Sequence, residues 1–569
     1  MTQAQKTIIK LLVVLLLSGS MLFMPFEEWG LPINAIQTRV IALFVFAALM
    51  WILEVIPIWT TSVMVITLAL LGTSNTSLNF LKVDKFDAKE VQAIVADAYG
   101  PSANADTVKA TQEAVVASLK KAASINPTVV RNTIATEILK PVTTGKADAD
   151  AKAALLAASG KLYDGEVSQR IAKMEMVNLT QQKSIFATFA DPIIILFLGG
   201  FFLADAATKF RLDINLARVL LKPFGTNPKY VLLGLMSVTA LFSMFMSNTA
   251  TAAMMLALLT PVLALFKPED RGRAAFALCI PIGANVGGIG TPIGTPPNAI
   301  ALKFMQEMGL NITFGKWMMF GVPFVIIMLL VGWLVLIKMF PISQKSLDLA
   351  KEMKGKFLTT PKAIIVYITF IVTILLWVIP KEYHGLDANS VAIIPIAVFS
   401  VTGVITKKDL RAMSWDVLWL VAGGFALGVA LSETNLAKDM INSIPFASWD
   451  SLMLLIGSSL ICLFMATFMS HTATAALLMP IMASVAAGMM TGPNAPMDSA
   501  GAIGLLVTIA FASSLGMALP ISTPPNAMAY ATGHVEQKGM AISGTILCLL
   551  GLAITIGLMS LLGAIGFFN

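Results

Sequence analysis

The chain has 569 residues, of which 57% are hydrophobic and only 12% are charged, and its formal net charge is +7. A soluble globular protein carries about 25% charged residues. So long and apolar a chain cannot cover its apolar surface with polar side chains, which excludes an ordinary soluble protein and indicates a membrane protein. The positive charge fits basic cytoplasmic loops, and no segment resembles a nucleic-acid-binding motif.

Apolar runs long enough to cross a bilayer follow one another along the chain. A transmembrane helix needs about 20 mostly apolar residues. The clearest runs are 8–26, 38–56, 192–207, 317–340, 363–379, 389–405 and 541–567. The first run follows a basic start but no small-residue cleavage site precedes the next run, so we interpret it as the first transmembrane helix rather than a cleaved signal.

Residues 75–185 interrupt this apolar pattern. They are polar and alanine-rich, with apolar positions at helical spacing in 107–123 and 149–157. The pattern predicts a small helical insertion outside the membrane, and we favour a structural cap over a domain that captures substrate.

Basic residues gather in four segments, at 209–229, 267–273, 345–362 and 407–411. Short cytoplasmic loops of membrane proteins carry an excess of lysine and arginine. All four segments fall on the cytoplasmic side if the amino terminus is cytoplasmic and two segments are re-entrant. The sequence then predicts a multi-pass protein of the plasma (inner) membrane, with the carboxyl terminus and the 75–185 insertion outside.

The two halves of the chain contain similar segments in the same order. The pairs are FLGGFFLADAATKFRLDINLA (197–217) with VAGGFALGVALSETNLAKDM (421–440), SNTATAAMM (247–255) with SHTATAALL (470–478), and GTPPNAIA (294–301) with STPPNAMA (522–529). Their offsets are 224, 223 and 228 residues. An odd number of crossings between the copies inverts the second copy, which is the inverted-topology repeat common among secondary transporters.

Helix-breaking polar residues stand at matching places in both halves. Two successive prolines remove two backbone donors and stop a helix, and the freed carbonyls must face protein or a wet cavity. Carbonyl, hydroxyl and amide oxygens suit sodium. The segments after the triplets, 250–259 and 473–479, would present helix amino termini to a carboxylate. An isolated triplet would most often bond only to its own helix, but two matched pairs favour a binding site without lysine or arginine.

The paired Ser-Asn/His-Thr and Thr-Pro-Pro-Asn motifs resemble those of the divalent anion/sodium symporter family, which includes sodium-coupled dicarboxylate, citrate and sulfate carriers. The resemblance covers the chain except 75–185. It implies an all-α polytopic membrane protein with two inverted-topology repeats, about eleven transmembrane helices and two re-entrant helical hairpins with the triplets at their tips. It also implies a homodimer, an elevator-type movement and no enzyme activity.

The resemblance implies a set of site residues as well. The residues expected at the substrate are Ser247, Asn248, Thr249, Thr295, Ser470, His471, Thr472, Thr523 and Pro524. Those expected at co-transported sodium ions are Ser243, Ser247, Asn248 and Gly294 in the first half and Met469, His471 and Ser522 in the second. The second half departs from the family pattern, because His471 replaces the usual asparagine and Ala466 stands where the first half has Ser243.

The combined prediction divides the chain into six segments. They are scaffold helices at 1–74, the insertion at 75–185, first-repeat transport elements at 186–314, scaffold helices with a cytoplasmic loop at 315–412, second-repeat transport elements at 413–538 and a last transmembrane helix at 539–569. The predicted function is symport of sodium with a di- or tricarboxylate such as succinate, malate, fumarate or citrate, in contact with membrane lipid. The alternatives are a sodium-independent anion exchanger of the same fold, a sulfate carrier, and a membrane receptor whose insertion binds the ligand.

Overall fold

The computed structural model describes residues 2–83, 88–99, 177–263, 266–347, 356–436, 451–490 and 495–568, apart from Glu27, Gly30, Pro32 and Pro268, together with Asp439 and a few residues between 108 and 119. Regular structure in this part of the chain is helical, with one isolated β-bridge between Ser74 and Thr180. The helix expected at 149–157 and most of the one at 107–123 lie outside the described residues.

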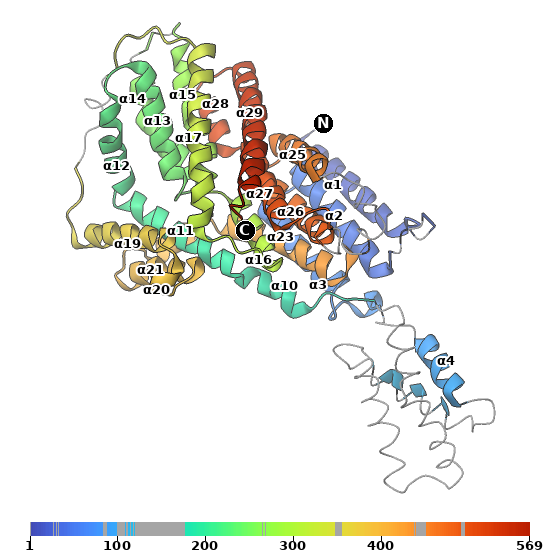
Figure 1. Ribbon diagram of the computed structural model, residues 1–569. Helices are drawn as coiled ribbons and strands as arrows, with labels where there is room; N and C mark the ends of the chain where they lie inside the picture. The colour runs from blue at the N-terminus through green and yellow to red at the C-terminus, as the bar shows by residue number, and fades with distance from the viewer. Residues whose placement is uncertain are drawn as a thin grey trace.

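The α-helices follow one another in chain order, as labelled in Figure 1. They are α1 (Gln3–Ser20), α2 (Ala35–Leu53), α3 (Ile58–Gly72), α4 (Ala88–Tyr99), α10 (Gln182–Ala187), α11 (Pro192–Lys209), α12 (Leu212–Leu221), α13 (Pro228–Ser243), α14 (Asn248–Leu263), α15 (Gly272–Gly288), α16 (Pro296–Glu307), α17 (Phe314–Met339), α19 (Pro361–Val378), α20 (Lys381–His384), α21 (Ala388–Val401), α22 (Lys407–Ala412), α23 (Trp415–Glu433), α25 (Ser451–Phe468), α26 (His471–Met489), α27 (Ser499–Leu515), α28 (Pro524–Ala531) and α29 (Gln537–Ala564).

Nine helical segments of the described residues are long and apolar enough to cross a bilayer, and five shorter apolar helices accompany them. The pairs α13–α14 and α25–α26 are helical hairpins, while α15–α16 and α27–α28 are helices interrupted once. If each interrupted pair counts as one crossing, the apolar helices outside the hairpins, together with α15–α16 and α28, give eleven crossings in the described part: α1, α2, α3, α11, α15–α16, α17, α19, α21, α23, α27–α28 and α29. The predicted all-α polytopic fold is confirmed.

Packing between the two repeats is reciprocal. Helix α11 of the first repeat packs on α21, and its counterpart α23 packs on α3. A Cβ at Gly199 would lie 2.5 Å from the carbonyl oxygen of Ala392 in α21, and one at Gly423 would lie 2.5 Å from Cβ of Ser62 in α3. The Gly-Gly segments therefore allow close helix packing, as small residues do in membrane proteins.

The helix contacts separate the membrane part into two groups. The hairpin group comprises α13–α17 and α25–α29, in which each hairpin packs on the interrupted helix of its own repeat and its second arm also contacts the interrupted helix of the other repeat. The frame group comprises α1–α3, α11 and α19–α23, and it runs along the lower and right-hand sides of Figure 1. Fewer contacts join the groups, chiefly those between α23 and α26.

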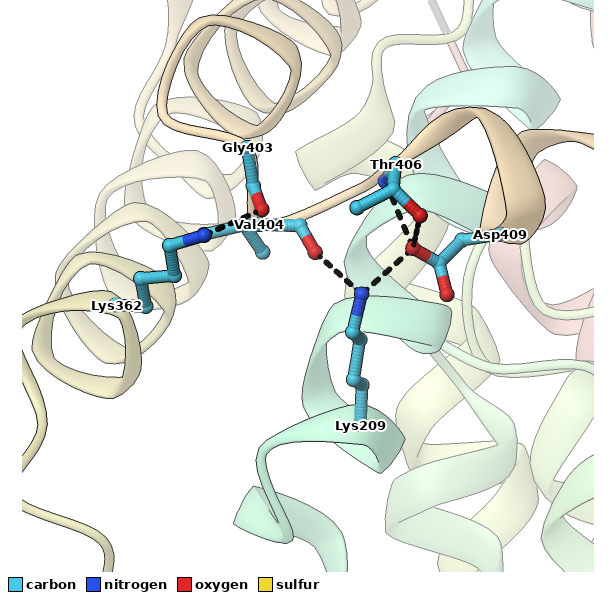
Figure 2. A network of polar contacts seen from close by, with 6 residues as sticks. All are labelled: Lys209, Lys362, Gly403, Val404, Thr406 and Asp409. Atoms are coloured by element: carbon cyan, nitrogen blue, oxygen red, sulfur yellow. Dashed lines mark hydrogen bonds and ion pairs between the residues drawn. The ribbon is translucent and has the colours of Figure 1, made fainter.

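A polar network ties the helix ends of the frame group together (Figure 2). Lys209, at the end of α11, places Nζ 2.6 Å from Oδ2 of Asp409 in α22, and Asp409 also accepts hydrogen bonds from Thr406. Lys362 in α19 donates to the carbonyl of Gly403 at 2.8 Å. Burial raises the pKa of Asp409, but the hydrogen bonds from Lys209 and Thr406 lower it more, to about 2. The Asp409 carboxylate is therefore charged at physiological pH.

The two ends of the segment predicted as an insertion lie side by side. The backbone amide of Asn75 donates to the carbonyl of Thr180 at 2.9 Å, and the amide of Thr180 donates to the carbonyl of Thr73 at 3.1 Å. The chain therefore leaves the membrane helices after α3 and returns at the same place before α10.

Gly287→Ala is expected to destabilise the hairpin group. A Cβ at Gly287 in α15 would lie 2.4 Å from Cα of Ala240 in α13, so the two backbones would have to separate. Overpacking of this kind typically costs about 1–3 kcal/mol. The apparent melting temperature in detergent measures the effect, with Gly557→Ala in α29 as the control because nothing lies within 4 Å of that position. Equal melting temperatures for the two variants would contradict the account of this contact.

Candidate functional site

A cavity of about 440 Å³ lies where the hairpin tips and the helix interruptions meet, and its size is typical of small-ligand sites. All nine residues expected at the substrate line it: Ser247, Asn248, Thr249, Thr295, Ser470, His471, Thr472, Thr523 and Pro524. Of the residues expected at sodium, Gly294 and Ser522 also line it, whereas Ser243 and Met469 are buried and do not. The structure thus brings the predicted residues of both halves to one place.

The mouth of the cavity lies at the amino-terminal ends of α3 and α23. Trp59 in α3 is 43% exposed, and Ser414 and Asp416 at the start of α23 are exposed. Among the described residues that line the cavity, Asp416 is the one charged side chain, and none is lysine or arginine. An anion in this cavity must therefore be held by neutral groups or by a bound cation.

Four helices begin at the cavity. Helices α14, α16, α26 and α28 begin at Asn248, Pro296, His471 and Pro524, and all four residues line the cavity. The prolines were expected to stop helices; instead each pair occupies the first turn of a new helix, where the missing backbone donor costs nothing. The positive ends of four helix dipoles converge here, which favours an anion.

The serine of each triplet caps the second arm of its hairpin. Oγ of Ser247 accepts from the amide of Ala250 at 3.2 Å, and Oγ of Ser470 accepts from the amide of Ala473 at 3.2 Å. A cap uses the hydroxyl oxygen as an acceptor. The hydroxyl proton is thus left to donate, and it can do so to an anion in the cavity.

In the first half, four oxygen-bearing groups converge at the Asn248 amide. With its nitrogen turned inward, the amide donates to Oγ of Ser243 at 2.6 Å, to the carbonyl of Gly294 at 3.2 Å and to that of Ala284 at 3.3 Å. With its oxygen turned inward, one hydroxyl, one amide and two carbonyl oxygens face one another. Oxygen ligands of this kind suit hard cations, so the second orientation is favourable with a cation between the four atoms.

The second half is built differently at the equivalent position. Nε2 of His471 lies 2.8 Å from the carbonyl of Gly516. Because a carbonyl only accepts, Nε2 carries the proton and is not free to bind a metal. Ala466 has no hydroxyl, and the neighbouring Thr467 donates its own to Leu463 in the same helix at 2.9 Å. The second half therefore offers fewer side-chain oxygens to a cation than the first.

The asparagine of each Thr-Pro-Pro-Asn motif holds the helix interruption together, a role that the sequence did not indicate. Nδ2 of Asn298 lies 3.0 Å from the carbonyl of Gly288 and 2.8 Å from that of Thr291. Nδ2 of Asn526 lies 2.7 Å from the carbonyl of Met517 and 3.1 Å from that of Leu519. Carbonyls freed by the interruptions are thus held by protein donors in both halves.

A hydroxyl group also connects each helix interruption to the hairpin tip of the same half. In the first half the hydroxyl lies near the start of the interrupting segment, and in the second half it lies near the end. Thr291 donates to the carbonyl of Met244 in the first half. Ser522 donates to the carbonyl of Thr467 in the second half at 2.7 Å. Met244 and Thr467 are equivalent in the repeat, whereas Thr291 and Ser522 are not, so the two halves make the same connection with different residues.

Asn285 is a cavity residue that sequence comparison of the halves missed. Its Nδ2 lies 3.3 Å from Oγ1 of Thr523 and 3.2 Å from Oδ1 of Asn526, so it links α15 of the first repeat to α28 of the second. Its counterpart in the second half is Ser513. Because the pair is not identical and lies inside an apolar helix, no repeated motif points to it.

Comparisons with known proteins found similar transporters. The family described as the sodium:sulfate symporter transmembrane region matches residues 114–566. An uncharacterized transporter of Haemophilus influenzae is 34% identical over 392 residues, which are 65% of this chain and 81% of that protein. The sodium-dependent dicarboxylate transporter SdcS of Staphylococcus saprophyticus is 31% identical over 412 residues, 66% of this chain and 77% of SdcS. The inorganic phosphate transporter PHO87 of Saccharomyces cerevisiae is 30% identical over 361 residues, 62% of this chain and 38% of PHO87.

A solved structure, the Alcanivorax borkumensis YdaH transporter, is similar with a TM-score of 0.45 and 12% identity, over 67% of this chain and 88% of that one.

Proposed function

We propose a transport function for this chain, which belongs to the family described as the sodium:sulfate symporter transmembrane region. The chain carries a di- or tricarboxylate, such as succinate, malate, fumarate or citrate, together with sodium across the plasma membrane. The observation that carries the proposal is the cavity at which four helix amino termini meet the two triplets, with no lysine or arginine among the described residues that line it. Nothing in this set of groups requires covalent chemistry, and we propose transport rather than an enzymatic reaction.

We assign a sodium ion to the oxygen cluster of the first half. The ligands proposed are Ser243, Asn248 and the carbonyl of Gly294, with Ser247 at the tip beside them. A cation there would offset the charge of a bound carboxylate, which explains how the cavity could hold an anion without basic side chains. Of the residues expected at a second sodium ion, Met469, His471 and Ser522, the histidine is engaged with Gly516 as a donor. We therefore propose that sodium coupling depends chiefly on the first half.

We propose that the substrate carboxylates meet the two triplets. Ser247, Asn248, Thr249 and Thr295 would bind one end, and Ser470, His471, Thr472, Thr523 and Pro524 the other. Two corresponding sets of residues, each with serine and threonine hydroxyls, suit a molecule with two anionic ends, and SdcS is named for dicarboxylates. Because PHO87 is named for inorganic phosphate, a tetrahedral inorganic anion such as phosphate or sulfate is the second candidate.

Unequal packing of the two hairpins supports alternating access. A Cβ at Gly424 in α23 would lie 2.5 Å from Cβ of Ala476 in α26, so these helices are in close contact. Ala253, the counterpart of Ala476 in α14, is exposed. In an inverted-repeat transporter the opposite state exchanges such environments between the repeats. We propose that the hairpin group moves against the frame group in an elevator-type movement, within a homodimer.

The proposed orientation assigns a side to the state seen here. With the amino terminus cytoplasmic and the carboxyl terminus and insertion outside, the basic residues Lys407, Lys408 and Arg411 lie in the cytoplasm just before the cavity mouth at Ser414. The cavity would then open inward.

Uptake into proteoliposomes tests the proposed function. An inward sodium gradient is expected to raise the rate of radiolabelled succinate uptake at least about tenfold over an equal potassium gradient, the size of a coupling of about 1.4 kcal/mol. Equal uptake in both gradients, together with exchange of internal for external succinate, would instead show a sodium-independent exchanger. Excess phosphate or sulfate is expected to compete poorly, and effective competition would favour the inorganic anion. Binding without uptake would indicate a receptor.

A further inference from the structure

Lys303 joins the hairpin group to the frame group through a largely buried ion pair. Its Nζ, in α16, lies 2.7 Å from Oδ2 of Asp191 at the start of α11, and the two side chains are only 12% and 13% exposed. The same Nζ lies 4.7 Å from the ring centre of Phe425 in α23 and 3.0 Å from Oε1 of Glu307 in its own helix. The ammonium group of Lys303, which belongs to the hairpin group, therefore contacts two helices of the frame group, α11 and α23.

Asp191 is fixed in place for this role. Its Oδ1 accepts from the amide of Ile193 at 2.9 Å and so caps α11, while Oδ2 is left for Lys303. Water screens a pair with so little exposure much less than a surface pair. If the two groups of helices separated at this point, each charge would lose its partner, either in water or in a buried environment. The ion pair therefore opposes the separation.

The ion pair lies on the side of the protein away from the cavity mouth. The mouth is at the amino-terminal end of α23, where Asp416 is exposed. Helices α11 and α23 are counterparts in an inverted repeat, so their amino-terminal ends lie at opposite faces of the frame group. Asp191 lies at the amino-terminal end of α11. The hairpin group and the frame group are in contact at that face, while the cavity is open at the opposite face.

On the mouth side, the described residues at the equivalent positions carry no charge. In the repeat, Lys303 corresponds to Ala531 and Asp191 to Trp415, whereas Phe425 corresponds to Phe201. The aromatic ring is retained but both charges are missing. When the two repeats exchange environments, these two positions cannot form an ion pair that replaces the one that breaks. A contact present in only one of two states shifts the equilibrium toward that state by its own free energy.

We propose that Lys303 and Asp191 form a latch that favours the conformation with the cavity open at Trp59 and Asp416, and that the latch opens in every transport cycle. The proposal rests on the transport function proposed above. It concerns the balance between the two states of the carrier rather than substrate binding, so it can be tested without substrate.

Two alanines at equivalent positions of the repeat can report the equilibrium between the two conformations of the carrier. Ala250 in the first hairpin is exposed, while its counterpart Ala473 is fully buried, so the two states should exchange their accessibility. Each is replaced by cysteine in a full-length background in which the three buried cysteines, Cys279, Cys462 and Cys548, are changed to alanine. Reaction with a maleimide is then timed in nanodiscs without substrate.

Lys303→Met removes the charge and keeps the length of the side chain. We expect this variant to slow labelling of Ala250→Cys at least about fivefold and to speed labelling of Ala473→Cys, since couplings between protein sites typically amount to 5–150-fold. Asp191→Asn, which keeps a good helix cap, is expected to act in the same direction. The double exchange Lys303→Asp with Asp191→Lys should restore the original ratio.

Lys209→Met is the matched control. Lys209 also pairs with an aspartate on another helix, but both partners lie in the frame group, so this variant should leave the labelling ratio unchanged. An unchanged ratio in Lys303→Met and Asp191→Asn would overturn the latch, and so would equal shifts in all three variants. If the ratio shifts as expected but sodium drives no uptake, the latch stands and the proposed function fails. If sodium drives uptake but the ratio does not shift, only the latch fails.

Discussion

Asn248→Ala is expected to abolish sodium-dependent dicarboxylate uptake while the protein still folds. The Asn248 amide is the group around which Ser243, Ala284 and Gly294 converge, and alanine removes its oxygen from the proposed cation site. Changing even a residue that only supports a metal ligand typically costs about 10–100-fold in affinity or activity. We therefore expect apparent sodium affinity to fall at least about 100-fold.

Thr260→Ala is the control for this variant. Thr260 lies in the same helix as Asn248 and donates to the carbonyl of Leu256 at 3.0 Å, a bond within α14. Succinate uptake by proteoliposomes is measured across a sodium titration for both variants, with gel filtration to confirm that each is folded. Normal sodium dependence in Asn248→Ala would remove the first-half cation site.

Asn298→Ala is expected to have the opposite signature, a loss of stability. Its Nδ2 lies within hydrogen-bond distance of three carbonyls that follow the end of α15, those of Gly288, Ile289 and Thr291, and the side chain is fully buried. An unsatisfied buried polar group costs about 1–3 kcal/mol. Trp317 also donates to the carbonyl of Ile289, and the amide of Gly294 donates to that of Thr291, so these two carbonyls keep a donor in the variant. With the donor to Gly288 lost, we expect a loss of about 1–3 kcal/mol and a fall in the apparent melting temperature in detergent.

Asn298→Asp separates the hydrogen bonds from the volume of the side chain. Aspartate has nearly the same shape but, when ionised, no donor, so it should destabilise the protein as much as alanine does. If Asn298→Asp melted like the wild type, donation by Nδ2 would not be what holds the interruption. Comparing Asn248→Ala with Asn298→Ala then distinguishes a residue proposed to bind the ligand from one that supports the loop.

Much of the fold was predictable because the chain repeats itself. Apolar length predicts membrane helices, and the matched triplets and Thr-Pro-Pro-Asn segments locate the hairpin tips and interruptions. The family resemblance carried by the duplicated motifs implied which residues line the cavity, because it placed both triplets, with Ser247 and Ser470, at hairpin tips that share one site. The cavity contains both.

The rest depends on contacts between residues far apart in the chain. In the second half, Ser513 stands at the position equivalent to Asn285, and Ala531 at the position equivalent to Lys303. Because neither residue type is repeated, comparing the halves could not identify these two residues. Asn298 stands in the motif, but its partners are backbone carbonyls, which no sequence pattern marks. The sequence did raise the doubt about His471, and its bond to Gly516 shows what the histidine does in this state.

Equilibrium binding of succinate to the purified protein, in sodium and in an equal concentration of potassium, tests the central claim most directly. If sodium and the carboxylate are held together by the neutral groups of one cavity, succinate should bind at least about tenfold more tightly in sodium, and by linkage succinate should tighten sodium binding by the same factor. Equal succinate affinity in the two salts would contradict the claim.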